Sequence, residues 1–356
     1  MSTRTESLPD SLLVIRLGAM GDIIHTLAAV APLRAALPDS TIAWVVEERW
    51  VELLCARGAE RSGPRNPARP LVDAVHVVNT KLWRKLPAAA STRQQVCAAI
   101  REIREPRYGV AVDFQGALKS ALIARLAGTR RIVGMKSPRE APAGMFYHQR
   151  VLTPASHVID QYSMLAEAVA QAPLARTSVV FPEDHAAEGA IAQKLREWGQ
   201  DFVLLSPGAG WGGKRWPAQR YAEVAQELAR LGLLPVVNAA PGEEELARIV
   251  QAAGQAQCCF CSTGELIALT RCARLFIGGD SGPLHLAAAL GVPVVAIFGP
   301  TDPKRNGPYG TKSIVLRSPA SCTSLSHTST PDPGLVRISS EEVIGATRRL
   351  LGEIRV

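Results

Sequence analysis

The feature of this chain that most limits its fold is a pattern repeated in both halves: a short apolar strand, a glycine-containing turn, then a helix. In the first half "SLLVIRL" precedes the turn "GAMGD", and helical spacing runs over residues 23–37. In the second half "RLFIGGD" precedes the helix "GPLHLAAALG", and "PVVAIFG" is a further strand. Strands that alternate with helices predict βαβ units and a parallel sheet. We therefore expect an α/β protein with two doubly wound domains, with ligands at the carboxyl ends of the strands in a cleft between them.

The length of 356 residues favours two domains, because a single hydrophobic core rarely organises so long a chain. Pro173 and Pro182 interrupt the regular patterns within "AVAQAPLARTSVVFPEDHAA", so the boundary is expected there. We assign residues 1–174 to an N-terminal domain and residues 175–338 to a C-terminal domain. An amphipathic helix is expected over residues 339–356, and the N-terminal domain is one surface on which it could pack.

The composition excludes several classes of protein. A hydrophobic share of 47% with 20% charged residues is ordinary for a soluble globular protein. No apolar run is long enough for a transmembrane helix, and the polar N-terminal residues lack a signal peptide, so a cytoplasmic location is expected. The net charge of +8 suits a phosphate-rich or anionic partner, but no nucleic-acid-binding signature accompanies it. The seven scattered cysteines predict neither a disulfide framework nor a metal site, since "CCFC" lacks a second pair at zinc-site spacing.

The turn "LGAMGDIIHT", residues 17–26, carries more than a chain reversal requires. Gly18 and Gly21 let the backbone approach a ligand, and the helix that begins near Asp22 offers free N–H groups to a negatively charged substrate. Asp22 has two interpretations: it caps this helix, or it faces the cleft as a general base that accepts a proton from a substrate hydroxyl. The spacing G-x-x-G-D is not the dinucleotide fingerprint G-x-G-x-x-G, which disfavours a dehydrogenase.

A second glycine-rich loop, "LLSPGAGWGGKRWP" over residues 204–217, has the composition of a diphosphate site. Its four glycines expose backbone N–H donors, and Lys214 adds one point charge. It is not a Walker loop, because no Ser or Thr follows the lysine. The alternative is a flexible loop with a surface lysine.

The stretch "FIGGDSGPLHLAAALGVPVVAIFGPTDP" places another helix N-terminus after a strand. Ser281 and Gly282 could donate backbone N–H groups to a phosphate. His285, on the first helical turn, is either a ligand contact or a satisfied packing residue. Glu243 follows a further strand and either accepts ribose hydroxyls or belongs to an acidic first helical turn.

Basic residues of the first half lie in three motifs, "NTKLWRKL", "VDFQGALKS" and "GMKSPREAPAGMFYHQR", where aromatic residues are interleaved with them. Such a wall suits an anionic, partly apolar acceptor presented at a membrane surface, although each charge alone is commonly solvated. The basic residues are Lys81, Arg84, Lys85, Lys119, Lys136, Arg139 and Arg150.

Together these motifs resemble the ADP-heptose:lipopolysaccharide heptosyltransferases of glycosyltransferase family 9, and most closely the heptosyltransferase I branch. The matching stretches, in family order over residues 12–316, are "RLGAMGDIIHTL", "WVVEE", "DFQGALKSA", "GMKSPREAPAGMFY", "KRWP", "GDSGPLHLAAALGVPVVAIFGPTDP" and "YG". The resemblance implies the GT-B fold, in which two Rossmann-like domains face a central cleft, the N-terminal one binding the acceptor and the C-terminal one the nucleotide-sugar. It also implies an inverting transferase that moves L-glycero-D-manno-heptose from ADP-heptose to the Kdo of Kdo-lipid A, in the synthesis of the lipopolysaccharide inner core.

Site residues carry over from the family by position. Asp22 matches the proposed base, and Lys214 matches the lysine on the donor phosphates. The other donor positions are Ala209, Gly210, Glu243, Cys261, Asp280, Ser281, Gly282 and His285, and the acceptor positions are Lys81, Arg84, Lys119 and Arg139.

The chain departs from the family pattern at several of these places. Ala209 and Gly210 stand where heptosyltransferase I tends to have two threonines, and Cys261 replaces a methionine near the adenine. Position 82 is leucine where the family has a third basic residue, and the arginine-rich loop 57–70 looks like an insertion. These differences concern the donor contacts and the choice of acceptor.

The resemblance implies no cofactor, since ADP-heptose is a substrate, and without a D-x-D motif it implies no metal requirement. It implies a monomer associated peripherally with the cytoplasmic face of the inner membrane. The alternatives are a heptosyltransferase II-like or other family transferase with a different acceptor or nucleotide-sugar, a nucleotide-sugar epimerase on a similar scaffold, or a binding protein without turnover.

Overall fold

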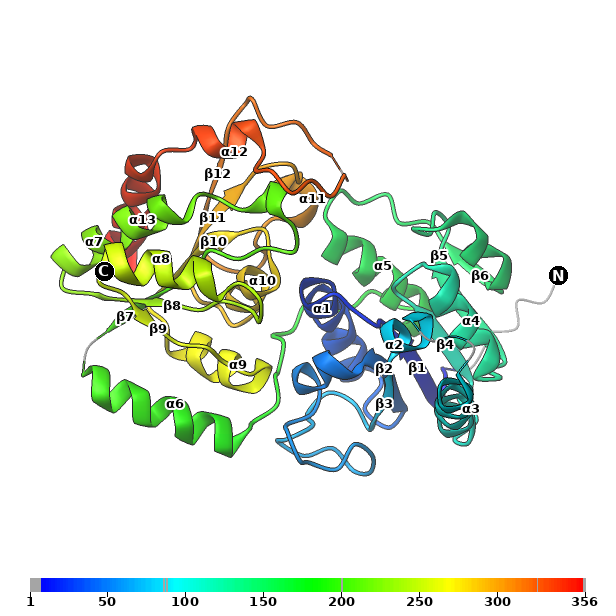
Figure 1. Cartoon of the computed structure of the whole chain (residues 1–356). Helices are drawn as coiled ribbons and strands as arrows, with labels where there is room; N and C mark the ends of the chain where they lie inside the picture. Colours follow the sequence, from blue (N-terminus) through cyan, green and yellow to red (C-terminus); the bar gives the residue numbers. More distant parts are fainter. Residues whose placement is uncertain (1–7, 86, 88, 200, 325, 355–356) are drawn as a thin grey trace. The chain divides into compact units, whose positions relative to one another are not determined.

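The computed structural model describes residues 8–85, 87, 89–199, 201–324 and 326–354. The chain divides into two compact units, Met1–Glu183 and Asp184–Val356, each built on its own parallel sheet of six strands (Figure 1). The expected α/β class with two doubly wound sheets is confirmed. Within the described ranges, the structure has no helix that is both long and apolar enough to cross a membrane.

The sheet of the first unit has the strand order β3-β2-β1-β4-β5-β6, and neighbouring strands pair in parallel. Its central strands are buried on both faces, as the unbroken apolar runs predicted. The strands are β1 (Ser11–Ile15), β2 (Thr41–Glu47), β3 (Ala74–Val78), β4 (Val110–Asp113), β5 (Arg131–Met135) and β6 (Gln149–Val151). The helices are α1 (Met20–Ala36), η1 (Glu48–Leu53), α2 (Thr80–Lys85), α3 (Ala90–Arg104), α4 (Leu118–Leu126), η2 (Ala141–Phe146) and α5 (Val158–Ala170), where η marks a 3-10 helix.

The sheet of the second unit has the order β12-β11-β10-β7-β8-β9, again with parallel pairing. The strands are β7 (Phe202–Ser206), β8 (Leu234–Val237), β9 (Gln257–Cys258), β10 (Leu275–Gly279), β11 (Val294–Phe298) and β12 (Ser313–Arg317). The helices are α6 (His185–Trp198), η3 (Gly212–Lys214), α7 (Ala218–Arg230), α8 (Glu244–Gly254), α9 (Thr263–Cys272), α10 (Gly282–Ala289), α11 (Pro303–Asn306), α12 (Pro333–Arg337) and α13 (Ser340–Ile354).

The two sheets have the same topology when their strands are counted in chain order. In each, the first and fourth strands are neighbours at the centre, and the other strands extend outward on both sides. A doubly wound sheet binds ligands at the carboxyl ends of these two strands, where the chain leaves in opposite directions. These strands are β1 and β4 in the first unit and β7 and β10 in the second, so the loops that carry Asp22, Lys214 and Asp280 and the motif "VDFQGALKS" lie at these switch points.

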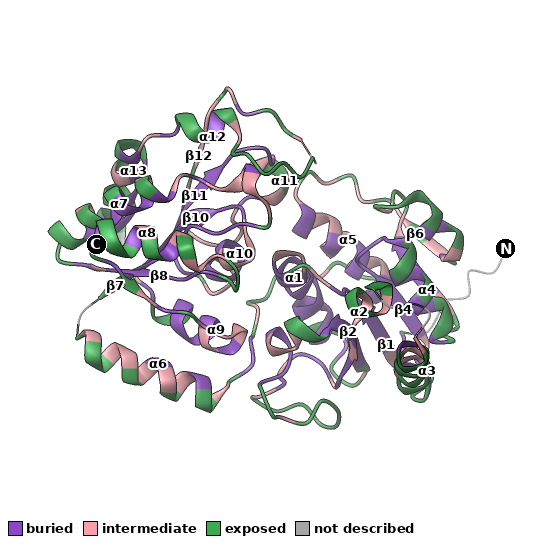
Figure 2. Cartoon of the chain, in the orientation of Figure 1, coloured by how far each residue is buried: buried purple, intermediate pink, exposed green. Residues whose placement is uncertain are grey.

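The C-terminal helix α13 completes the core of the second unit. Its buried residues Val343, Ala346 and Leu350 join the cluster formed by β7, β10 and α7, and the helix contacts α7 and β12. Figure 2 shows the strands and the inner sides of the helices buried in both units. The buried residues of α13 are therefore used within the core of the second unit.

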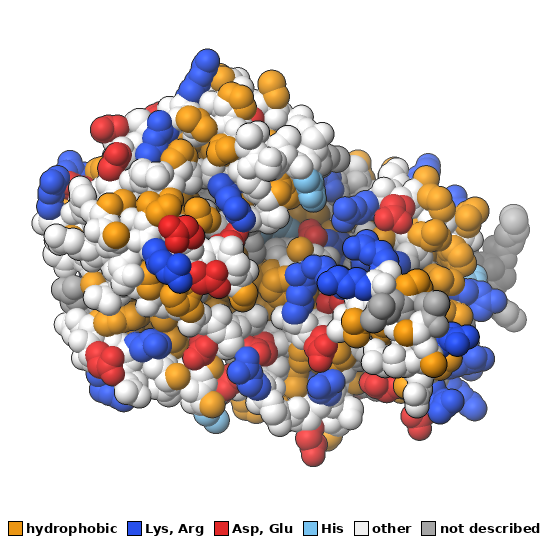
Figure 3. Space-filling view, viewed as in Figure 1, with side chains coloured by type: hydrophobic (Ala, Val, Ile, Leu, Met, Phe, Trp, Pro, Cys, Tyr) orange, Lys and Arg blue, Asp and Glu red, His pale blue; other side chains and the backbone are white. Residues whose placement is uncertain are grey.

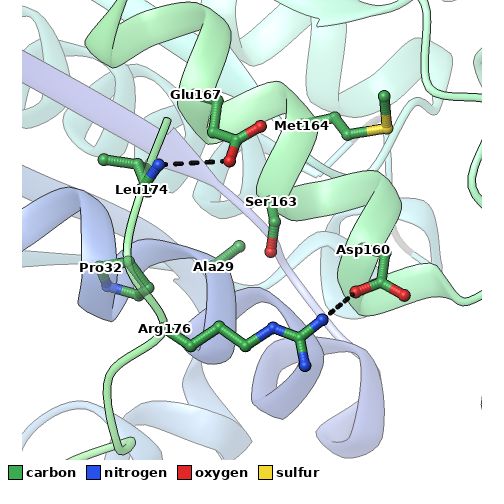
Figure 4. Close-up of a pocket in the computed structure, with 8 residues that line it drawn as sticks. All are labelled: Ala29, Pro32, Asp160, Ser163, Met164, Glu167, Leu174 and Arg176. Atoms are coloured by element: carbon green, nitrogen blue, oxygen red, sulfur yellow. Dashed lines mark hydrogen bonds and ion pairs between the residues drawn. The ribbon is translucent and has the colours of Figure 1, made fainter. Parts of the chain in front are cut away.

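The segment that joins the units is held by the first unit. Phe181 is 1% exposed, and the backbone N–H of Glu183 donates to the carbonyl of Pro67 at 2.9 Å. Arg176 Nη2 lies 3.1 Å from Asp160 Oδ1, an ion pair drawn in Figure 4. These contacts give the division at 183/184, nearer to the second unit than the boundary of 174/175 that the sequence suggested.

The ion pair also borders a small pocket between α1, α5 and the joining segment (Figure 4). The pocket has a volume of about 190 Å³ and contains none of the predicted site residues. Its lining residues are Ala29, Pro32, Asp160, Ser163, Met164, Glu167, Leu174 and Arg176.

Candidate active site

Asp22 lies in the first turn of α1 and is 39% exposed. Its Oδ2 accepts a hydrogen bond from the backbone N–H of Ala19 at 3.1 Å and lies 2.7 Å from a guanidinium nitrogen of Arg16. Among the described residues, Oδ1 of Asp22 has no hydrogen-bond or ion-pair partner. One oxygen therefore caps the helix while the other stays available to a substrate, so the two interpretations of this residue are compatible.

Arg16 is a residue of this site that the motifs did not single out. Its side chain is 5% exposed and donates to the carbonyl of Phe114 at 2.6 Å and to the hydroxyl of Tyr162 at 3.0 Å, as well as to Asp22. A buried guanidinium with three partners fixes the position of the carboxylate that it contacts. The signal was present in "LLVIRL", because a charge that follows an apolar strand directly has to find a partner.

Asp113 organises the loop after β4. Its Oδ1 accepts from the backbone N–H groups of Gln115 and Gly116 at 2.9 and 3.0 Å. Its Oδ2 accepts from Ser120 Oγ at 3.0 Å and from the Tyr147 hydroxyl at 2.7 Å. Burial raises the pKa of Asp113, and the hydrogen bond from Tyr147 is the largest of the contributions that oppose the rise. The residue thus shapes the motif "VDFQGALKS" from inside the protein.

Two of the predicted acceptor residues, Arg84 and Arg139, lie within electrostatic reach of a third, Lys119. Partial burial lowers the pKa of Lys119, Glu47 opposes this, and the charges of Arg84 and Arg139 lower it further. The ammonium of Lys119 also donates to Thr80 Oγ1 at 3.3 Å. The fourth residue, Lys81, is exposed on α2 together with Arg84. Figure 3 shows Lys and Arg side chains gathered on the surface near α2, which could receive an anionic group.

In the second unit, Lys214 and Asp280 form a buried ion pair between the loops after β7 and β10. Lys214 Nζ contacts Asp280 Oδ2, and the side chains are 12% and 6% exposed. Oδ1 of Asp280 lies 3.1 Å from Nε2 of His285, which is buried on α10. Burial alone would raise the pKa of Asp280, but the hydrogen bond with His285 and the charge of Lys214 hold it below its usual range. The structure thus brings three of the predicted donor residues into contact.

The N-terminus of α10 lies beside this cluster and carries an unsatisfied hydroxyl. Ser281 is the N-cap residue, yet its side chain makes no capping hydrogen bond. Its Oγ is buried, and no atom of the described residues is its hydrogen-bond partner. Since buried polar groups are nearly always paired, an orphan at this place indicates a ligand group. A phosphate fits, because the free N–H groups of a helix N-terminus and a lysine are its usual partners.

Glu243 is the N-cap residue of α8, and its carboxylate connects two loops. Its Oε1 accepts from the backbone N–H of Ala209 at 3.2 Å and from a guanidinium nitrogen of Arg215 at 2.8 Å. A Cβ at Gly208 would come within 1.9 Å of Glu243 Oε2, so this loop needs glycine there. Gly210 next to it is exposed. Arg215, which follows Lys214, is a second cation of the site that the motif did not emphasise.

Cys261 follows β9, with its Sγ 3.5 Å from Sγ of Cys259. The hydrogen bond with Cys259 and burial raise the pKa of the Cys261 thiol, so it is neutral and can pack on a base as a thioether would. The amide of Asn238, at the end of β8, donates to the carbonyl of Cys259 at 2.8 Å. This contact holds the loop of Cys259 and Cys261 beside the end of β8, the strand that precedes Glu243. In the described ranges, no three His, Cys, Asp or Glu side chains are grouped to hold a metal ion.

The Ser/Thr/Pro-rich segment after β12 covers the loop that carries Lys214. The His327 ring stacks on Trp211 with centroids 4.1 Å apart and planes at 8°. Lys214 Nζ lies 4.1 Å from the centre of the same indole. The backbone N–H of Gly213 donates to the carbonyl of Thr328 at 3.0 Å. The sequence predicted a loop here but gave no sign that it would pack on the donor loop.

Comparison with known proteins gives one family model that matches the chain, "Glycosyltransferase family 9 (heptosyltransferase)", over residues 96–333. Lipopolysaccharide heptosyltransferase 1 of Pseudomonas aeruginosa is 29% identical over 323 residues, which cover 87% of this chain and 84% of that protein. Lipopolysaccharide heptosyltransferase 1 of Escherichia coli strain K12 is 27% identical over 325 residues, 86% of this chain and 93% of that protein. The solved structure of E. coli heptosyltransferase WaaC with ADP is similar in fold, with a TM-score of 0.75 at 22% identity, covering 97% of this chain and 99% of that one.

Proposed function

The chain belongs to glycosyltransferase family 9, and from that premise we propose that it transfers L-glycero-D-manno-heptose from ADP-heptose to the Kdo of Kdo-lipid A. It is a glycosyltransferase, and its similarity to lipopolysaccharide heptosyltransferases places it in the synthesis of the lipopolysaccharide core. The proposal adds the identity of the acceptor, inversion at the anomeric carbon, a monomer at the cytoplasmic face of the inner membrane, and no cofactor.

The observation that carries the proposal is the donor cluster of the second unit. Lys214 and the N-terminus of α10 present a cation, backbone N–H groups and the orphan hydroxyl of Ser281. ADP-heptose has a diphosphate between its nucleoside and its sugar, and this diphosphate supplies the acceptors that the cluster lacks. As the bond from the anomeric carbon to the diphosphate breaks, negative charge grows on the departing oxygen, and these fixed donors stabilise it.

Asp280 and His285 keep this cluster in order while the donor is absent. The ion pair with Asp280 satisfies the charge of Lys214, and the imidazole of His285 fixes the other carboxylate oxygen. Lys214 can then share its charge between Asp280 and a phosphate without a large rearrangement. In this proposal Glu243, the N-cap residue of α8, contacts the ribose, and Cys261, in the loop after β9, packs on the base.

The first unit supplies the acid–base group. An acceptor hydroxyl attacks the anomeric carbon from the side opposite ADP, the new carbon–oxygen bond forms, and ADP leaves with the electrons of the broken bond. Asp22 Oδ1 receives the hydroxyl proton, while Arg16 and Ala19 hold Oδ2. Lys81, Arg84, Lys119 and Arg139 bind the carboxylate and phosphates of the acceptor.

The test is ADP release from purified protein with ADP-heptose, with and without Kdo-lipid A in detergent. We expect release only with the acceptor, unaffected by EDTA. Asp22→Asn should lower kcat by about a hundredfold or more, the usual effect of removing a general base, while ADP binding measured by calorimetry stays unchanged. Ser281→Ala should instead weaken ADP binding by about tenfold, because it removes one donor to the diphosphate.

Other outcomes separate the alternatives. Turnover on heptosyl-Kdo-lipid A but not on Kdo-lipid A would replace the acceptor and assign a heptosyltransferase II-like activity. Consumption of donor without any acceptor would contradict transfer and point to hydrolysis or epimerisation. An Asp22→Asn variant with full kcat would show that another group accepts the proton.

A further inference from the structure

Helix α4 carries an apolar stripe on its outer side. Leu118, Leu122 and Leu126 are spaced by four residues and are 42%, 44% and 42% exposed. The inner side of the same helix is in the core, where Ala121 and Ala124 are fully buried. A surface helix normally turns polar residues outward, so leucines at three successive turns mark a face that has a partner.

The 3-10 helix η2 packs against α4 and extends this apolar face. Its Met145 is 74% exposed, the largest exposed fraction among the large hydrophobic residues of the described chain. Figure 3 shows hydrophobic side chains gathered on the first unit over α4 and β6. A patch with long, flexible side chains of this kind can enter a soft, disordered medium more easily than a fixed protein surface.

Cations surround the patch. Lys119 and Arg125 are exposed on α4 between the leucines. Arg139 lies at the start of the helix, because a Cβ at Gly116 would be 2.9 Å from its backbone nitrogen. Arg150 donates to the carbonyl of Gly144 at 2.7 Å, next to Met145. Two acids, Glu47 and Glu140, interact with Lys119, and Glu140 Oε2 accepts a hydrogen bond from the backbone N–H of Leu118 at 2.8 Å.

We propose that this face, the α4 patch of Leu118, Leu122, Leu126 and Met145 with its four cations, docks on an anionic lipid bilayer. The leucines and the methionine insert at the boundary between headgroups and acyl chains, and the cations meet lipid phosphates. The charge favours this occupant over a second copy of the chain, since a twofold self-contact would bring like charges together.

The inference rests on the proposed function in one respect: Lys119 and Arg139 belong to both the patch and the acceptor site. A lipid acceptor whose bilayer is held against α4 would reach these two residues without leaving the membrane plane. The test of docking is therefore run without donor or acceptor, so that its failure and a failure of the proposed function can be told apart.

The experiment measures binding of the full-length protein to vesicles by sedimentation. We expect binding to vesicles of equal parts phosphatidylglycerol and phosphatidylcholine, much weaker binding to pure phosphatidylcholine, and a decrease as salt is added. Leu122→Gln with Leu126→Gln should weaken binding by about tenfold or more, and Arg125→Gln by about fivefold. Leu231→Gln is the matched control, since Leu231 is 39% exposed but lies in the second unit.

Activity provides the second readout. The leucine double variant should keep its rate on Kdo-lipid A dispersed in detergent and lose most of it on the same acceptor in vesicles. The proposal would be overturned if the wild-type protein did not bind anionic vesicles, or if the double variant bound them as tightly as the wild type does. So would light scattering that shows a dimer which the double substitution converts to monomer, because the patch would then be a self-association surface.

Discussion

At the scale of single residues, Asp113 holds the loop after β4 in the candidate site of the first unit, although its own side chain is fully buried. Burial raises the pKa of this carboxyl above its unfolded value of about 3.9. The folded state therefore holds the proton more tightly than the unfolded state, and this contribution to stability is lost as the pH rises through the folded pKa. Asp113→Asn removes the titration, so the stability of the variant relative to wild type should increase from pH 4 to pH 8.

Urea unfolding at several pH values would measure this difference. Asp113→Ala is the control, since it leaves the Tyr147 hydroxyl and the N–H groups of Gln115 and Gly116 without an acceptor. It should cost about 2–4 kcal/mol at every pH, as expected for buried donors left unpaired. If Asp113→Asn lowers the free energy of unfolding at pH 8 as much as Asp113→Ala does, the negative charge itself stabilises the fold. Arg16 would be its partner, since the charge of Asp113 helps to raise the pKa of Arg16.

The sequence singled out the side chains of the candidate site more readily than the partners that these side chains have in the structure. Asp22 and Lys214 stand in glycine-containing turns after strands, and this local pattern suffices to find them. Arg16 meets Tyr162 across 146 positions of the chain, and Lys214 meets Asp280 across 66. Contacts over such separations depend on the strand order of the sheet, which no local pattern contains.

At the scale of elements, the segment 318–332 is the part of the donor site with the least sequence signal. Its described residues form no helix or strand, and they are held to the loop that carries Lys214 by the hydrogen bond between Gly213 and Thr328 and by the stack of His327 on Trp211. Because Trp211 also contacts Lys214, we expect His327→Ala to make the position of the Lys214 side chain less fixed. An aromatic stack contributes about 0.5–1.5 kcal/mol, so the KM for ADP-heptose should rise by about threefold to tenfold.

Steady-state kinetics and Trp fluorescence would test this expectation. His327 is exposed, so the variant should unfold at the same urea concentration as wild type. His185→Ala on α6, also exposed and in the same unit, is the matched control and should leave KM unchanged. An unchanged KM in His327→Ala would show that the ion pair with Asp280 positions Lys214 without help from the stack.

Regular elements were easier to predict than loops because their signals are local. Helical spacing over residues 23–37 corresponds to α1 at Met20–Ala36, with its start earlier because the turn before it is short. The helix at the C-terminus was also correct as an element. Its contacts with α7 and β12 could not be predicted, since an amphipathic pattern shows that one face is buried but not against which sheet.

At the scale of the whole molecule, the same sheet topology occurs twice, and each of the two sheets has its own hydrophobic core. The apolar strand runs and the glycine turns predicted this repeat, because both halves use the same local pattern. The exact division could not be read from prolines alone. Residues 175–183 are irregular in sequence and structure, yet Glu183 and Arg176 bond to Pro67 and Asp160 of the first unit, and Phe181 is buried.

This attachment predicts how fragments of the chain behave. A fragment of residues 1–183 keeps the whole core of the first unit and should unfold cooperatively in urea. A fragment of residues 1–174, cut at the boundary that the sequence suggested, loses the burial of Phe181 and the hydrogen bond from Glu183 to Pro67. Burying one phenylalanine contributes about 1.5–3 kcal/mol, and one net hydrogen bond about 1 kcal/mol, so the shorter fragment should be less stable by about 2–4 kcal/mol.

The Arg176 ion pair should add little to this difference, since its guanidinium is 76% exposed and surface pairs contribute at most about 1 kcal/mol. Phe181→Ala in the longer fragment should therefore reproduce most of the loss, and Arg176→Gln should not. Equal stability of the two fragments would mean that residues 175–183 contact the first unit but do not stabilise it. Residues 175–183 would then be a linker outside the stable core of the first unit, and that core would end at the boundary of 174/175 that the sequence suggested.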